Sequence, residues 1–168
     1  MRPQRFEEIL QGLLKQAGGQ VKDVVTVREA GYDKHPYGLS VTYASGARVL
    51  LQVISVLADG DKHARPEQII EGENALEPVP VPDVFEGGKL QLAKVDQHLA
   101  ALLINSGSRE IASVTPYTDE PDDHTAVRYG LRVAYHDTSR IHVYVVHALS
   151  AGRDSWPHGG EFNVPAAV

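Results

Sequence analysis

The amino-acid sequence predicts an α+β fold made by internal duplication, in which two αβββ units with antiparallel sheet are related by pseudo-twofold symmetry. Two observations predict it: a gap-free internal repeat, and the same order of helical and strand periodicity in both copies. Residues 37–60 align with residues 129–152 at a constant offset of 92, and nine of the 24 pairs are identical. Average residue frequencies predict about one or two identities. The identical pairs are Tyr37/Tyr129, Gly38/Gly130, Leu39/Leu131, Val41/Val133, Tyr43/Tyr135, Arg48/Arg140, Val53/Val145, Leu57/Leu149 and Gly60/Gly152.

The repeat continues upstream at an offset of 89. Apolar and glycine positions then coincide, pairing Leu10, Leu13, Leu14 and Gly18 with Leu99, Leu102, Leu103 and Gly107. At the same offset Val25 and Thr26 fall on Val114 and Thr115. The change of offset predicts a three-residue insertion in the second copy, which we place in residues 119–124. Amphipathic helices and hairpins can resemble one another by patterning alone, but the shared Tyr-Gly-Leu and Arg identities are not demanded by a periodicity.

Each copy begins with an expected helix. Apolar residues recur at helical spacing in the first copy, at Phe6, Ile9, Leu10, Leu13 and Leu14, and Gly18 and Gly19 end the helix. The second helix, over residues 90–104, is apolar over a wider arc. We therefore expect it to be more buried, between the two sheets or against a partner subunit.

A strand over residues 21–29 and a hairpin follow the first helix. Three-residue turns at residues 45–47 and 137–139 would pair Tyr43 with Val49 and Tyr135 with Ile141, which keeps apolar residues on one face. Whether the two sheets join at their edges or stack is open. We favour an edge-joined sheet, because the second hairpin has a charged outer face that stacking would bury.

The domain organisation follows from the repeat. We expect a first αβββ unit at residues 1–60, a Pro-rich connector at 61–88, a second αβββ unit at 89–152 and an irregular C-terminal tail at 153–168. The connector contains the run Pro-Val-Pro-Val-Pro, which favours an extended chain that wraps the surface or carries function. The tail lacks periodicity and is expected to hang loose except where Trp156 or Phe162 docks.

Composition restricts the possible functions. The chain has 42% hydrophobic and 23% charged residues, as expected for a globular protein. Its formal net charge of −6 repels phosphate backbones, so nucleic acid is an unlikely partner. The absence of cysteine excludes disulfides and thiolate metal sites. No signal peptide or membrane span is evident, so we expect a soluble cytoplasmic protein.

No motif predicts catalysis, a cofactor or a metal site. The eight histidines lack metal-ligand spacing, and His142 and His147 are expected on opposite faces of one strand. The acidic cluster Asp119, Glu120, Asp122 and Asp123 is expected to be a solvated turn. Residues 159–162 read Gly-Gly-Glu-Phe, which resembles the signature turn of diguanylate cyclases, but the second acidic residue and a nucleotide-binding domain are missing, so we assign no family.

The outer face of the second hairpin is the candidate binding site. Four side chains should project together there, namely Arg128, Arg132, His142 and Tyr144, whereas their counterparts in the first copy are Pro36, Ser40, Leu50 and Gln52. Paired arginines are good donors to an anion, a nucleic-acid phosphate or a partner carboxylate. The alternative is a solvated sheet face without a function.

Three classes of function remain. The sequence favours a non-enzymatic interaction or assembly protein, either a regulatory subunit or a structural component of a larger complex, with a protein partner or self-association. The alternative is a small-ligand-binding protein with its site between the two repeats or on the Arg128, Arg132, His142 and Tyr144 face. The third is an enzyme, which would need histidine and carboxylate side chains that only the fold brings together.

Overall fold

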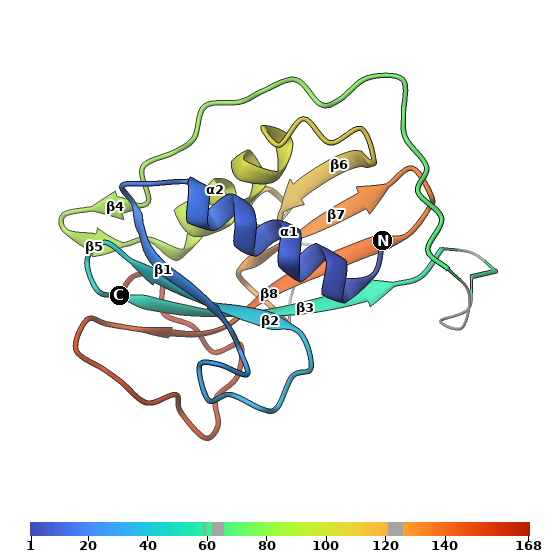
Figure 1. The fold of residues 1–168 in the computed structure, drawn as a ribbon. Coiled ribbons are helices and arrows are strands. Elements are labelled where there is room, and N and C mark those ends of the chain that lie inside the picture. Colours follow the sequence, from blue (N-terminus) through green and yellow to red (C-terminus); the bar gives the residue numbers. More distant parts are fainter. Residues whose placement is uncertain (59, 62–65, 121–125) are drawn as a thin grey trace.

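The computed structural model describes residues 1–58, 60–61, 66–120 and 126–168. The protein is α+β: two helices lie on one face of a six-stranded antiparallel sheet with strand order β1-β2-β3-β8-β7-β6 (Figure 1). The elements are α1 Pro3–Gln16, β1 Val21–Thr26, β2 Gly38–Tyr43, β3 Arg48–Val56, β4 Phe85–Glu86, β5 Lys89–Leu90, α2 Leu92–Ile104, β6 Ile111–Pro116, the 3-10 helix η1 Tyr117–Asp119, β7 Gly130–Tyr135 and β8 Arg140–Leu149. The strands β4 and β5 form a separate small ladder.

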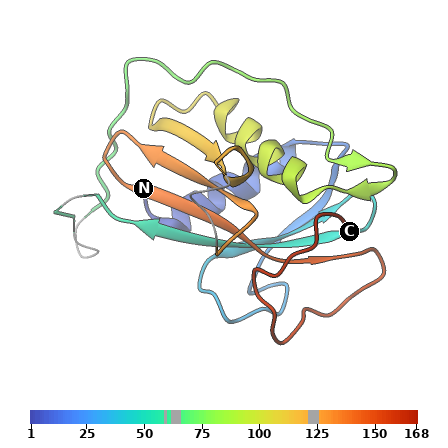
Figure 2. The same ribbon diagram turned by 180° about the vertical axis from the view of Figure 1, so that it is seen from behind.

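The two three-stranded groups join at their edges. Strands β3 and β8 are antiparallel neighbours, with Gln52 opposite Tyr144 and Val53 opposite Val143. The preference for an edge-joined sheet is therefore confirmed. One face carries the helices, and the other, which we call the outer face, is partly covered by the segment between β1 and β2 and by the C-terminal tail (Figure 2).

The predicted hairpin register is wrong by two residues in both hairpins. Val41 lies opposite Val49, and Val133 lies opposite Ile141. The three-residue loops are residues 44–46 and 136–138, since the amide of Tyr43 donates to the carbonyl of Ala47 and that of Tyr135 to Ser139. Each loop ends on a residue with positive φ, Gly46 at 87° or Thr138 at 69°, as three-residue hairpin loops require. A shift of two residues leaves the apolar side chains on the predicted face.

Strand β1 is shorter than expected and aligned differently. It ends at Thr26, because Glu29 accepts hydrogen bonds from the amide and the hydroxyl of Thr26 and turns the chain.

Val24 lies opposite Val41, and Val114 lies opposite Val133. The predicted match of Val25 with Val114 is thus wrong by one residue. The predicted insertion and acidic cluster lie partly outside the described residues.

The two helices differ in burial as expected. Helix α1 starts with Pro3, whose fixed φ suits a first turn, and buries Phe6, Leu10 and Leu14. Helix α2 buries eight of its 13 residues. Both contribute to one core with the inner face of the sheet. Neither helix in the described part of the chain has the length and apolar character of a membrane span.

The C-terminal tail docks through Trp156 and Phe162 as expected, and it is held at further points that the sequence did not predict. Phe162 donates its amide to the carbonyl of Val146, and Trp156 and Phe162 pack against the outer face. Further along, Val168 and Leu90 exchange two backbone hydrogen bonds, and Val164 is buried in the main core. Tail residues without periodicity are held by contacts with distant strands.

Candidate functional site

Three of the four predicted site residues gather on the outer face. Arg132 lies opposite His142 in the β7–β8 ladder, and the rings of His142 and Tyr144 are 5.9 Å apart. The Arg132 guanidinium forms a 3.0 Å ion pair with Glu120. Arg128 lies ahead of β7, with its guanidinium 5.2 Å from the ring centre of Tyr129, which belongs to the helix-side core.

Two residues that sequence reasoning missed complete this group. The hydroxyl of Tyr117, from η1, is hydrogen-bonded to Nδ1 of His142 at 2.7 Å, and the Tyr117 and Tyr144 rings are 5.9 Å apart. Burial raises the pKa of the Tyr117 hydroxyl. Phe162 packs edge-on against Tyr144 at 6.1 Å. No pattern in the sequence could link them, because they come from separate irregular segments.

A bulge in β8 overturns the expectation that His142 and His147 lie on opposite faces. Leu51 lies opposite Val145 and Leu50 opposite His147, which leaves Val146 as an extra residue. The extra residue reverses the alternation of side chains beyond it. The His147 ring therefore stacks with Trp156 on the outer face, the same face as His142.

The bulge brings His147 into a polar cluster with Tyr32, His35 and Glu161. Glu161 accepts a hydrogen bond from the Tyr32 hydroxyl and lies 3.1 Å from Nε2 of His35. The Tyr32 oxygen lies 3.4 Å from Nε2 of His147. The segment between β1 and β2, strand β8 and the tail each contribute, so the fold does unite histidine and carboxylate side chains.

The hydrogen bonds of the cluster assign its protons. Gln52 Nε2 donates to Nδ1 of His35 at 2.9 Å, so His35 carries its hydrogen on Nε2 and donates it to Glu161. The hydrogen bond from Tyr32 holds the pKa of Glu161 below its ordinary value. Burial raises the pKa of Tyr32 and lowers that of His147. The cluster is thus a chain of hydrogen-bond donors that ends on the Glu161 carboxylate.

The cluster holds the tail in place and borders a pocket. Lys34 donates to the carbonyl of His158 at 2.9 Å, and Arg48 lies 4.5 Å above the Trp156 ring. Beside them a pocket of ≈ 390 Å³ is lined by Tyr32, Lys34, Trp156 and His158. Over the described ranges, no group of three histidine or acidic side chains could hold a metal ion.

A second candidate is the connector around Val79. The Asn105 side chain, just after α2, accepts from the Val79 amide and donates to the Val79 carbonyl, both at 2.8 Å. Gln20, just before β1, donates to the Pro82 carbonyl at 3.0 Å and accepts from the Val84 amide at 2.7 Å. Two side-chain amides thus fix the backbone of residues 78–84, which we call the proline ridge, at two points.

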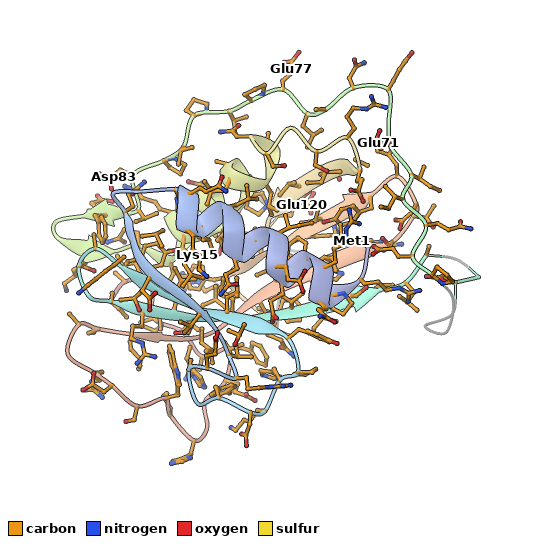
Figure 3. All side chains as sticks on the ribbon, viewed as in Figure 1. Met1, Lys15, Glu71, Glu77, Asp83 and Glu120 are labelled. Atoms are coloured by element: carbon orange, nitrogen blue, oxygen red, sulfur yellow. The ribbon has the colours of Figure 1, made fainter. Side chains whose placement is uncertain are left out.

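The proline ridge presents apolar and acidic side chains to solvent. Val79 and Val81 are 38% and 45% exposed, and the flanking Glu77 and Asp83 are also exposed. Figure 3 shows Glu77 pointing away from the body of the protein. Alternating prolines fix φ and favour an extended polyproline conformation. This is an ordered, extended segment whose free side faces solvent.

Comparisons with known proteins yield no relative: no family model matches the chain, and no curated protein or solved structure matches it significantly.

Proposed function

We propose that the chain is a non-enzymatic interaction or assembly protein whose partner binds the proline ridge. The observation that carries this proposal is the double clamp of Asn105 and Gln20 on an exposed Pro-Val-Pro-Val-Pro segment. A segment already held in its extended conformation loses little conformational entropy when a partner binds it. A cytoplasmic location is part of the proposal and rests on the sequence expectation alone.

The distribution of exposed apolar side chains supports the same surface. Among the described residues six large apolar side chains are exposed, and four of them belong to the connector, namely Ile69, Ile70, Val79 and Val81. Single exposed apolar residues are normal, but Val79 and Val81 are alternate residues of the ridge, and neighbouring exposed apolar side chains favour a binding surface. The polar cluster around Glu161, by contrast, uses its hydrogen bonds to hold the tail.

The ridge indicates the chemistry of its partner. Polyproline segments bind in grooves lined by aromatic side chains, which pack against the proline rings and the residues between them. Glu77, just before the ridge, and Asp83, near its end, are exposed and acidic, so the groove would carry basic residues at its ends. The partner is a separate protein with such a groove or, in self-association, another copy of this chain.

A second candidate function is small-ligand binding in the pocket of ≈ 390 Å³. The observation that favours it is the combination of aromatic walls from Tyr32 and Trp156 with the polar side chains of Lys34 and His158. Pockets that combine apolar walls with a few polar groups are typical of ligand sites. The Arg132, His142 and Tyr144 group remains a proposed anion site on the same face.

We also propose that the two halves arose by duplication. Two features support equivalent chain paths. A Cβ at Gly38 would lie 2.0 Å from the carbonyl oxygen of Leu51, and one at Gly130 would lie 2.2 Å from that of Val143, so both glycines make the same close approach at positions 92 residues apart. Both β1 and β6 also have a register shift at their first residues.

The interaction proposal is tested by disrupting the ridge without touching the core. In quantitative affinity purification from source cells, the double variant Val79→Asp and Val81→Asp should recover much less of the partner than the unaltered protein does. Once the partner has been purified, crosslinking should show the same loss of binding. The matched control is Ile9→Asp, because Ile9 is 37% exposed on α1 and lies outside the ridge. Equal recovery of the partner by both variants would contradict the proposal, and light scattering distinguishes a second copy from another protein.

A further inference from the structure

The tail segment of residues 154–162, which we call the strap, lies across the outer face of the sheet (Figure 2). Arg48 Nη1 donates to the carbonyl of Asp154 at 3.1 Å, and the amide of Phe162 donates to Val146 at 2.9 Å. Between these two anchors, Trp156 stacks on His147 with the ring planes 23° apart. The strap is thus attached near both ends, and in between by the stacking of Trp156 on His147 and by the hydrogen bond from Lys34 to the His158 carbonyl.

The strap helps to cover a small apolar cluster that is separate from the main core. Val27, Leu50 and Val146 are almost fully buried and form this cluster with Tyr32, and Trp156 and Phe162 pack against it. The helix-side core contains none of these residues. Opening the strap would therefore expose an apolar patch while the main core stays intact.

His147 lies at the centre of the contact, with 4% of its surface exposed. Tyr32 has one hydroxyl hydrogen and donates it to Glu161, so Nε2–H of His147 donates to the Tyr32 oxygen. A second proton on the His147 ring would place a positive charge between Tyr32 and Trp156. Burial of a charge in such a position is unfavourable unless a partner compensates it.

The charged groups around His147 do not provide that compensation. Glu161 of the strap attracts a protonated His147, but it already accepts hydrogen bonds from Tyr32 and His35. Lys34 and His35, between β1 and β2, oppose the additional charge. Arg48 of β3 lies over the Trp156 ring and places a further positive charge next to the strap.

The backbone of the strap also favours release. Phe162 has a φ of 65°, in the left-handed region that non-glycine residues seldom adopt. The residue next to the Glu161 contact is therefore strained as long as the strap is closed. Opening would relieve this strain.

We propose that the strap opens on mild acidification, when His147 takes up a proton, and uncovers the patch of Val27, Leu50 and Val146. The closed state lowers the pKa of His147. Neutral His147 therefore stabilises the closed strap fully above the ordinary histidine pKa of about 6.5, and this stabilisation is lost as the pH falls below that value. The pKa of Glu161 is also lowered. The Glu161 contact therefore persists to a more acidic pH than an ordinary carboxylate would allow.

The fluorescence of Trp156 tests the proposal, because Trp156 is the single tryptophan of the chain. Between pH 7.5 and pH 5 the emission should shift to longer wavelength and iodide quenching should increase severalfold, with a midpoint below pH 6.5. Far-UV circular dichroism should stay constant over this range. His147→Gln, which can donate to Tyr32 but cannot take up a proton, should remove the transition. The control His158→Gln, on the strap itself, should keep it.

Three results would overturn the proposal. These are an emission spectrum that does not change down to pH 4.5, a transition retained in His147→Gln, and loss of circular dichroism at the same midpoint as the emission change. If His147→Gln does not fold, nuclear magnetic resonance of the unaltered protein decides the question. The His147 ring and the single indole N–H signal should then titrate with one midpoint, and two separate midpoints would contradict coupling.

Discussion

Gly38 lies so close to Leu51 that a Cβ at position 38 would be 2.0 Å from the Leu51 carbonyl oxygen. Gly130 stands in the same relation to Val143, with a distance of 2.2 Å. Real side chains do not approach backbone oxygen so closely, so any larger residue must push strands β2 and β3, or β7 and β8, apart. The Tyr-Gly-Leu identity in the two halves thus has a steric reason that the sequence alone did not reveal.

Gly38→Ala and Gly130→Ala should each destabilise the protein by about 2–4 kcal/mol, since overpacking next to backbone strains the ladder. Urea unfolding followed by circular dichroism measures this. The control is Gly12→Ala, because Gly12 lies in α1 with nothing within 4 Å of an added Cβ. It should stabilise by about 0.5–1 kcal/mol. Equal effects at positions 12 and 38 would contradict the close approach.

Asp96→Asn should raise stability more at pH 8 than at pH 4. Asp96 is fully buried in α2, where the backbone N–H of Gly130 favours its charged form and the negative charge of Asp119 opposes it. Burial raises its pKa well above the ordinary value, so the folded state holds a proton that the unfolded state releases, and stability falls as the pH rises above about 4. The variant removes this fall and should gain about 1–3 kcal/mol at pH 8. Thermal melts across pH check it, with Asp23→Asn on the exposed part of β1 as the control.

His98→Phe should protect the protein against acid. Burial lowers the pKa of His98 to about 4, and its ring lies edge-on to Tyr43 at 6.3 Å. Neutral, buried His98 favours the folded state above about pH 6.5, and this stabilisation is lost as the pH falls toward 4. The loss in the free energy of unfolding is at most about 3 kcal/mol. Phenylalanine keeps the ring contact and does not titrate. Urea midpoints at pH 7 and pH 4.5 should therefore differ less in the variant, whereas exchanging the exposed His136 for Gln should leave the difference unchanged.

Asn105→Ala should loosen the proline ridge without unfolding the protein. The substitution removes both side-chain hydrogen bonds to Val79, so the Val79 amide should exchange with solvent at least tenfold faster, which hydrogen exchange with mass spectrometry measures. Partner affinity should fall with it, because the ridge must then be ordered on binding. Asn74→Ala, also at the surface of the connector, is the control. Unchanged exchange at Val79 would refute the clamp.

The sequence predicted the α+β class, the antiparallel strands and the greater burial of the second helix, because these follow from apolar periodicity. The edge-joined sheet followed from the charged outer face of the second hairpin, which stacking would have buried. It did not predict the hairpin register. The register depends on which residue takes the positive φ that closes the loop, and in the second hairpin that residue is Thr138, which carries no glycine signal.

The candidate sites were less predictable. His142 and His147 share a face because of one extra residue, Val146, and the adjacent valines 143, 145 and 146 give no sign of where a bulge will occur. The amide clamps of Gln20 and Asn105 act on chain about 60 and 26 residues away in sequence. Such contacts depend on the folded arrangement of irregular segments, for which no periodic pattern exists.

The position of β8 determines when the sheet can be completed during synthesis. Strand β8 is the last strand of the chain but occupies a central place, between β3 and β7. The ribosome must therefore release residues 140–149 before β3 gains its second neighbour. Until then the nascent chain presents β3 as an open, apolar edge, and native pairing requires contacts of about 90 residues' separation, which makes folding slow and exposes the intermediate to aggregation.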